Sequence, residues 1–322
     1  MNTSSLKVVA IGGGTGLSTM LRGIKKYTPN ITAIVTVSDN GGGSGILREE
    51  MNIIPPGDIR NCIVALANTE PVMKQLLQYR FKEGSLKGQN FGNLLLAALA
   101  DVSGNFEKAV QVTSNVLAIT GKVLPVTLED VQLYATFENG ICVKGETQIV
   151  DYSKANHIMI EDIRLEPDNP KPAEEVIEAI EDADIILLGP GSLYTSIIPN
   201  LLIKEVSEAT RKSKAEKVYI ANMMSQPGET TGFTIEDHIE ELEKFIGKNT
   251  LDKVIVNNED VPEEYLKKYI EDGAHMLMLN DAHPIWQTLK RIEAPLVQVN
   301  HEKQFIRHNP VSYTHLRAHE TA

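Results

Sequence analysis

The feature that most constrains the fold is the glycine-rich segment 12–16 (Gly-Gly-Gly-Thr-Gly), which separates a β-branched run from an amphipathic stretch. Residues 6–11 are typical of a buried parallel strand, and residues 17–27 place apolar side chains at helical spacing. A second β-branched run covers residues 31–37. Strand, glycine turn, helix and strand in this order predict a right-handed βαβ unit within a parallel sheet.

The rest of the chain repeats this alternation, with one interruption. Apolar runs at 184–188, 217–221 and 253–256 predict further strands, and residues 93–100 and 173–182 predict helices. Pro71 suits a first helical position, and Thr234 with Asp237 resembles a capping box. The interruption lies in the middle of the chain, where strand-like runs at 131–137 and 141–145, joined through Asn139-Gly140, predict a hairpin. We therefore expect an α/β fold, a mostly parallel sheet flanked by helices, with a small β-rich excursion at roughly 116–165.

No linker divides the chain, so residues 1–310 are predicted to form a single domain. Residues 311–322 match the translation of a transposon adaptor used in sequencing libraries. We expect this tail to be an artefact of an assembled gene fragment, without ordered contacts, that replaces the natural C-terminus.

Composition excludes several classes of protein. The formal net charge is −12 without a basic block, which disfavours nucleic-acid binding. No apolar run approaches the roughly 20 residues that span a bilayer, and the N-terminus lacks a signal-peptide pattern. The two cysteines and the histidines show no metal-ligand spacing. His238 is predicted to be solvated on the polar side of its helix. The sequence thus predicts a cytoplasmic protein with no membrane span.

The glycine-rich turn itself suits a phosphate, because backbone N–H groups at a helix N-terminus can approach an anion where no Cβ intervenes. The alternative is a tight turn without a ligand. Leu17 occupies the place of the third glycine of the dinucleotide fingerprint, so no NAD requirement is expected. The residues predicted to bind phosphate are Gly12, Gly13, Gly14, Thr15 and Gly16.

Three further polar segments directly follow predicted strands. Ligands of open parallel sheets bind at this edge of the sheet, outside the C-terminal ends of the strands. Asp39 could bond a ribose hydroxyl or hold a metal ion, or merely cap a turn. Gly191 and Ser192 belong to a second glycine turn that we expect to face the first across a cleft. Asn222 and Gln226 could read a base or sugar, or form an ordinary polar loop.

Asp58 stands where a helix N-cap is expected, and Arg60 could pair with it or with a phosphate. The segment Gly-Pro-Gly-Ser-Leu around Ser192 is not a nucleophile elbow, which disfavours serine hydrolysis. Neither glycine-rich turn is followed by the Gly-Lys-Ser or Gly-Lys-Thr of a P-loop, which excludes a standard P-loop ATPase.

These motifs together resemble the bacterial gluconeogenesis factors, within the superfamily of the 2-phospho-L-lactate transferase CofD. The resembling stretches are residues 11–16, 37–45, 55–61, 92–93, 188–199 and 226–230. The resemblance implies a Rossmann-like fold, binding of a UDP-sugar, and a role in carbon-flux and cell-wall or cell-shape homeostasis on non-sugar carbon sources. It adds Asn93 and Thr195 as supporting residues and leaves a homo-oligomer and the protein partner open.

No reaction is established for this branch, so enzymatic activity stays open. The alternative is a transferase with a nucleotide-diphosphate-linked donor, in which Asp39 and Asp58 would hold Mg²⁺ and Arg60 would assist. Three positions depart from the family pattern: Asn40 replaces an aspartate, Ile46 an arginine and Gln89 a histidine. Asn40 in particular casts doubt on a two-carboxylate metal site.

Overall fold

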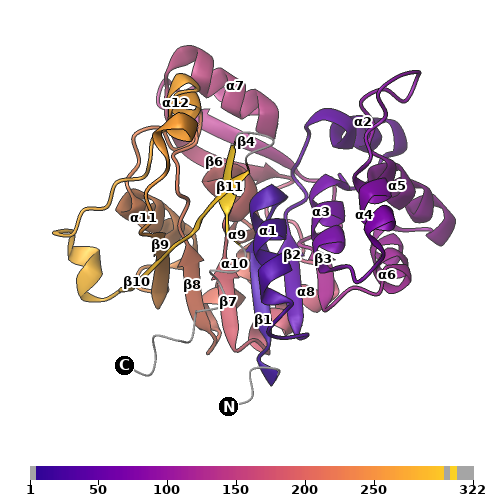
Figure 1. The fold of residues 1–322 in the computed structure, drawn as a ribbon, viewed down its shortest axis with the longest axis horizontal. Helices are drawn as coiled ribbons and strands as arrows, with labels where there is room; N and C mark the ends of the chain where they lie inside the picture. The colour runs from indigo at the N-terminus through magenta and orange to yellow at the C-terminus, as the bar shows by residue number, and fades with distance from the viewer. Residues whose placement is uncertain (1–4, 301–304, 310–322) are drawn as a thin grey trace.

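The computed structural model describes residues 5–300 and 305–309. Its centre is a seven-stranded parallel sheet in the order β10-β9-β8-β7-β1-β2-β3 (Figure 1). The strands are β1 (Val8–Gly12), β2 (Ile31–Val35), β3 (Lys122–Pro125), β7 (Ile185–Leu188), β8 (Glu216–Ile220), β9 (Lys253–Asn257) and β10 (Lys290–Ala294). The α/β fold class expected from the sequence is confirmed.

Helices cover both faces of the sheet. The chain leaves β1 toward β2 on one side and leaves β7 toward β8 on the other, and right-handed crossovers therefore place their helices on opposite faces. The helices are α1 (Gly14–Ile24), α2 (Gly42–Met51), α3 (Gly57–Leu66), α4 (Pro71–Gln78), α5 (Phe91–Ser103), α6 (Phe106–Val116), α8 (Glu174–Glu181), α9 (Ile198–Leu201), α10 (Lys204–Lys212), α11 (Ile235–Ile246) and α12 (Glu263–Glu271).

Helix starts follow the sequence signals in two places. Pro71 begins α4, and Thr234 caps α11 by exchanging hydrogen bonds with Asp237, as predicted. The apolar face of α1 is also confirmed, since Leu17 and Leu21 are fully buried against the sheet.

The excursion is a three-stranded antiparallel sheet, β5-β4-β6, with one helix packed on it. Its elements are β4 (Gln132–Phe137), β5 (Cys142–Lys144), α7 (Glu146–Asn156) and β6 (Ile160–Glu166). The predicted hairpin is confirmed, but the predicted start at 116 is wrong. β3 pairs with β2 at the edge of the main sheet, and a four-residue strand ending in proline carries too little pattern to be assigned beforehand.

A second antiparallel pair, β11 (Val297–Asn300) with β12 (Phe305–His308), was not expected. Two short helical turns complete the described elements: the π-helix η2 (Leu193–Ile197) and the 3-10 helix η3 (Pro284–Gln287). One continuous apolar core joins the main sheet and the excursion. In the described ranges no helix is long and apolar enough to span a bilayer. The predicted tail at 311–322 lies outside those ranges.

Candidate functional site

A polar cleft of about 830 Å³ lies at the C-terminal ends of β1 and β7. β1 pairs with β2 on one side and β7 on the other, so the direction of chain progression reverses between β7 and β1. Open α/β sheets bind their ligands at such a point. The volume lies within the range of small-molecule sites.

The first glycine turn forms one wall of the cleft. Gly14 has φ +66°, a left-handed conformation that strains other L-residues. A Cβ on Gly13 would lie 2.7 Å from Asp58 Oδ2, and one on Gly16 would lie 2.5 Å from the carbonyl oxygen of Pro190. Thus part of the glycine requirement comes from packing against neighbours. Gly14 is different, because the space beside its Cα belongs to the cleft. A Cβ added there would meet no protein atom closer than 3.8 Å.

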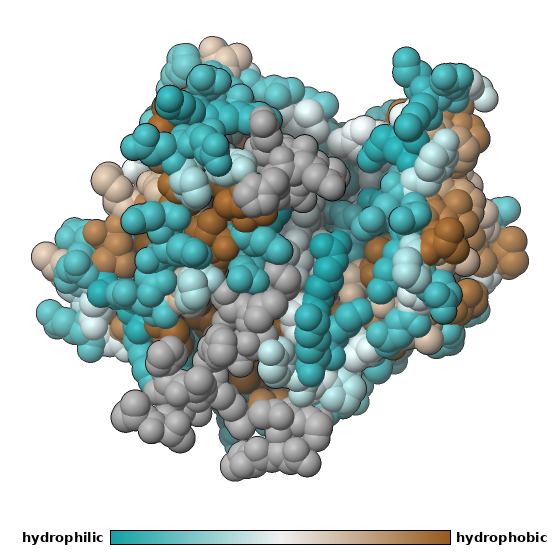
Figure 2. All heavy atoms as spheres, viewed as in Figure 1, coloured by the Kyte–Doolittle hydropathy of each residue, from teal (hydrophilic) through white to brown (hydrophobic). Residues whose placement is uncertain are grey.

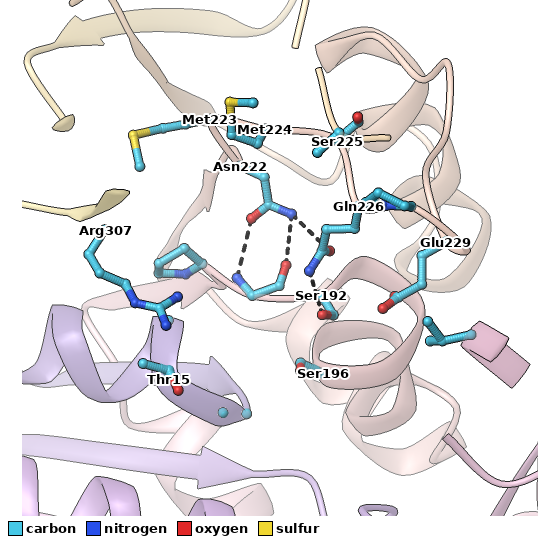
Figure 3. A pocket seen from close by; sticks show the side chains of 18 of the residues that line it. Thr15, Ser192, Ser196, Asn222, Met223, Met224, Ser225, Gln226, Glu229 and Arg307 are labelled. Atoms are coloured by element: carbon cyan, nitrogen blue, oxygen red, sulfur yellow. Dashed lines mark hydrogen bonds between the residues drawn. The ribbon is translucent and has the colours of Figure 1, made fainter. Parts of the chain in front are cut away.

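The second glycine turn, residues 189–192, lies directly against the first, as the close approach of Gly16 to Pro190 shows. Asn222 Nδ2 donates to the carbonyl oxygen of Gly191 at 2.9 Å. Gln226 Nε2 donates to Ser192 Oγ at 2.6 Å (Figure 3). Asn222 and Gln226 line the cleft as predicted, but their amides brace this turn rather than standing unengaged.

Five carboxylates from separate segments also line the cleft: Asp39, Asp58, Glu146, Glu229 and Asp272. Burial, followed by the nearby charge of Asp39, raises the pKa of Asp58 to about 7. Burial likewise raises the pKa of Glu146 well above its ordinary value, with Asp39 as the next contribution. Burial also raises the pKa of Asp39, although the Gly41 N–H donates to its carboxylate at 2.7 Å. The cleft therefore holds acids that accept a proton more readily than carboxylates in water.

The predicted N-cap role of Asp58 is wrong. Pro56 is the N-cap residue of α3, and Asp58 lies within the first helical turn. Its carboxylate lies against the first glycine turn, where a Cβ on Gly13 would meet it, and the Gly14 N–H partly offsets the rise in its pKa. Asp58 therefore packs against the first glycine turn and supports it. This role depends on a tertiary contact, so the local sequence could not reveal it.

Four predicted residues are not among those that line the cleft. The Arg60 side chain packs beneath Gly92, with Nη1 3.5 Å from the carbonyl oxygen of Leu77. Asn93 Nδ2 donates to Ser44 Oγ at 3.3 Å, and Thr195 Oγ1 donates to Glu229 Oε1 at 3.1 Å. The carbonyl oxygen of Gly12 accepts from Thr36 N–H. They support the residues around the cleft instead of facing it.

The sequence interpretation missed residues on three elements, of which α12 contributes Tyr269. Glu146, Val150 and Lys154 line the cleft from one face of α7, at the i, i+4, i+8 spacing that could have suggested it. Arg307 and His308 reach the cleft from β12, and the Arg307 side chain extends toward Thr15 (Figure 3). Burial lowers the pKa of His308 to about 4.

The residues fit a weakly held magnesium ion better than a dedicated metal cage. Within the described ranges no three or more His, Cys, Asp or Glu side chains are grouped so as to hold a metal ion. Mg²⁺ commonly binds through one or two carboxylates together with water and substrate phosphates. Asp39 and Asp58 could supply such carboxylates only when a phosphate ligand completes the coordination.

Comparisons with known proteins agree with the fold. The profile of the family described as "2-phospho-L-lactate transferase CofD" matches residues 8–299. A protein of Thermoanaerobacterium thermosulfurigenes named "Putative gluconeogenesis factor" is 55% identical over 304 residues, covering 94% of this chain and 93% of that protein. The "Gluconeogenesis factor" of Bacillus subtilis is 47% identical over 269 residues, covering 83% and 84%. The crystal structure of an upf0052 family protein from Bacillus halodurans has a TM-score of 0.92 at 40% identity, covering 97% and 99% of the two chains.

Proposed function

The chain belongs to the family of the 2-phospho-L-lactate transferase CofD, and we propose that it is a gluconeogenesis factor that binds a UDP-sugar in the cleft. On this proposal the protein acts in the cytoplasm, in carbon-flux and cell-wall or cell-shape homeostasis on non-sugar carbon sources. The observation that carries the binding proposal is the contact of two glycine turns at the point where β1 and β7 end.

The diphosphate would lie on the backbone N–H groups of Thr15 and Gly16 at the N-terminus of α1, beside Gly14. The eleven-residue helix adds favourable partial positive charge at this end. Lys154 and Arg307 also line the cleft and would offset part of the ligand's negative charge. Asn222 and Gln226 would keep the second turn in place beneath the ligand.

The proposal predicts stabilisation by UDP-sugars. A ligand at 100 times its Kd stabilises the folded state by about 2.7 kcal/mol, which a thermal-shift assay detects as an increase of several degrees in Tm. We expect this shift with UDP-glucose or UDP-N-acetylglucosamine and none with NAD. A shift with NAD and none with the UDP-sugars would refute the proposal.

A variant pair separates ligand binding from backbone strain. In Gly14→Ala the added methyl group enters the cleft, and we expect Kd for the UDP-sugar to rise at least tenfold. Gly104 also has a left-handed φ, +84°, but it ends α5 and lies outside the cleft lining. Gly104→Ala should therefore lose a similar stability, about 1 kcal/mol, and keep its affinity. If Gly14→Ala and Gly104→Ala bind the UDP-sugar with equal affinity in titration calorimetry, the diphosphate does not bind at the first glycine turn.

The raised pKa of Asp58 favours a second function, a transferase that uses a nucleotide-diphosphate-linked donor. A carboxyl group with a pKa of about 7 exchanges protons readily at neutral pH, as acid–base catalysis requires. Mg²⁺ held by Asp39 and the ligand phosphates would supply charge stabilisation for a leaving nucleotide, while Asp58 would exchange the proton. This function predicts Mg²⁺-dependent release of nucleotide, which Asp58→Asn should slow at least 100-fold. A sugar nucleotide that stays intact with Mg²⁺ and acceptor alcohols would exclude it.

A further inference from the structure

The two glycine turns differ in how far the protein itself already occupies their polar groups. At the second turn, Asn222 Oδ1 accepts from the Gly191 N–H at 3.4 Å, and Asn222 Nδ2 donates to the Gly191 carbonyl oxygen at 2.9 Å. Just beyond this turn, Glu229 accepts hydrogen bonds from the Tyr194 N–H and from Thr195 Oγ1, each at 3.1 Å. A carboxyl group of the protein therefore already lies at the start of η2, where an anion would otherwise approach.

The segment that carries Glu229 is held firmly in this position. The Gln226 N–H donates to Thr230 Oγ1 at 3.0 Å, and the Gln226 carbonyl oxygen accepts from the N–H groups of Glu229 and Thr230, each at 2.9 Å. The Gln226 side chain is in turn bonded to Ser192 Oγ. A ligand phosphate would have to displace a buried, doubly hydrogen-bonded carboxyl group to reach the donors at the start of η2.

Ser196, which also belongs to η2, offers a donor that the protein does not use. It lines the cleft and is 7% exposed, and within the described part of the chain its hydroxyl group has no hydrogen-bond partner (Figure 3). Its backbone is fixed, because its N–H donates to the Ser192 carbonyl oxygen at 2.9 Å and its carbonyl oxygen accepts from Asn200 Nδ2 at 2.9 Å. The hydroxyl group is thus held in the wall of the cleft and is available to a ligand.

The Ser196 hydroxyl lies where the two glycine turns meet. A Cβ built on Gly14 and one built on Gly191 would each lie 3.8 Å from Ser196 Oγ. Gly14 is followed by Thr15 and Gly16 at the N-terminus of α1, where the diphosphate would lie. A phosphate group beside Gly14 would therefore bring an oxygen atom within hydrogen-bond distance of Ser196 Oγ.

Asp58 approaches the same place and is compatible with a phosphate there. Its Oδ1 would lie 3.9 Å from a Cβ on Gly14. Burial, more than any other cause, raises the pKa of Asp58 to about 7, so a large fraction of the molecules carries a neutral carboxyl group at neutral pH. The protonated form donates a hydrogen bond to an anion instead of repelling it.

A hydroxyl group that donates to a charged acceptor forms a stronger hydrogen bond than one between neutral groups. We propose that Ser196 is a ligand-binding residue whose hydroxyl group donates a hydrogen bond to the diphosphate of the bound nucleotide sugar. This inference rests on the proposed binding of UDP-sugars. It assigns the diphosphate to the space between the first glycine turn and Ser196, with a side-chain hydroxyl rather than backbone N–H groups contributed from η2.

Titration calorimetry of Ser196→Ala with UDP-glucose tests the inference. We expect Kd to rise at least tenfold, because a hydrogen bond to a charged group is lost. The Tm of the ligand-free protein should not fall, because the hydroxyl group has no partner in the protein to lose. In phosphorus NMR, the diphosphate resonances of UDP-glucose at saturation should differ between the variant and the wild-type protein.

Ser153→Ala is the matched control, because Ser153 is also a buried helical serine, in α7, and lies outside the cleft lining. Its hydroxyl donates to the Ile158 carbonyl oxygen at 2.6 Å, so this variant should lose stability and keep the wild-type Kd and phosphorus resonances. A wild-type Kd in Ser196→Ala, or a raised Kd with unchanged phosphorus resonances, would overturn the role of Ser196 while leaving UDP-sugar binding intact. Absence of binding by the wild-type protein would instead overturn the proposed function and this inference with it.

Discussion

At the scale of single residues, the protein uses several polar side chains for its own support that the sequence suggested for ligand binding. Asn40 is the clearest case. Its side chain points to the start of α7, through hydrogen bonds with Thr147 and Gln148, and it does not line the cleft. In this chain, residue 40 therefore supports the start of α7 rather than the wall of the cleft.

His238 shows a similar reversal, because it is fully buried rather than solvated. The segment after α12 covers the polar side of α11, where Glu236 accepts hydrogen bonds from Asn280 N–H and Trp286 Nε1–H. His238 Nδ1 contacts the carbonyl oxygen of Thr234 at 2.8 Å, so Nδ1 carries the proton, and the buried Nε2 has no partner in the described structure. Burial lowers the pKa of His238 below its ordinary 6.5.

This burial predicts a loss of stability in acid. Unfolded His238 takes up a proton near pH 6.5 and the folded form does not, so the free energy of unfolding falls as pH drops through that value. One such proton contributes at most about 1.4 kcal/mol per pH unit. We expect His238→Asn to flatten the pH dependence of urea unfolding between pH 7 and 5. His157→Asn is the control at an exposed histidine, and an equal slope in the two variants would contradict the assignment.

At the scale of elements, the two glycine turns behave as one packed unit, and Gly16 lies at their contact. Alanine normally stabilises a helix by about 1 kcal/mol relative to glycine. Gly16→Ala should instead destabilise by about 1–3 kcal/mol, because its Cβ would lie 2.5 Å from the backbone oxygen of Pro190. Denaturant unfolding measures the change.

Gly43→Ala provides the comparison for that prediction. Gly43 also lies in the first turn of a helix, α2, but its added Cβ would meet the end of the Gln89 side chain, which can move. The change in stability should therefore be smaller than at Gly16. A Gly16→Ala protein as stable as wild type would show that the two turns can separate without cost.

Elements with strong periodicity were predictable, and those held mainly by tertiary contacts were not. Strands β7, β8 and β9 and helix α1 carry buried runs or an apolar stripe, which local sequence reveals. Helix α7 buries Ile149 and Ser153 alone, so it has no apolar stripe to detect. β11 and β12 stabilise each other through pairing between residues that neither strand's pattern specifies.

The same division applies to the candidate site. The rule that ligands bind at the C-terminal ends of parallel strands predicted that Gly14, Asp39 and Ser192 lie at one cleft. All three line the cleft in the structure. Glu146 and Arg307 could not be found this way, because they arrive from elements outside the parallel sheet. Their position depends on how α7 and β12 dock, which no local pattern encodes.

At the scale of the whole molecule, charge and polarity are unevenly distributed. Hydrophobic residues gather over α4, α5 and α6 (Figure 2), where Val72, Val102 and Val116 are exposed. The cleft is different, since carboxylates and other polar groups make up much of its wall. The described residues that line it include five carboxylates (Asp39, Asp58, Glu146, Asp272 and Glu229) and two lysine or arginine side chains (Lys154 and Arg307). An anionic ligand must therefore enter an acidic cleft in a protein of net charge −12.

This balance predicts an unusual dependence of binding on salt. Long-range repulsion between a UDP-sugar and the acidic protein is screened as ionic strength rises from 0.02 to 0.15 M, where the Debye length falls to about 8 Å. We expect Kd for UDP-glucose to decrease over this range in titration calorimetry. MgCl₂ at equal ionic strength should lower Kd further if the ligand phosphates and Asp39 share the ion. A Kd that increases with NaCl would mean that attraction to Lys154 and Arg307 outweighs the repulsion from the rest of the molecule.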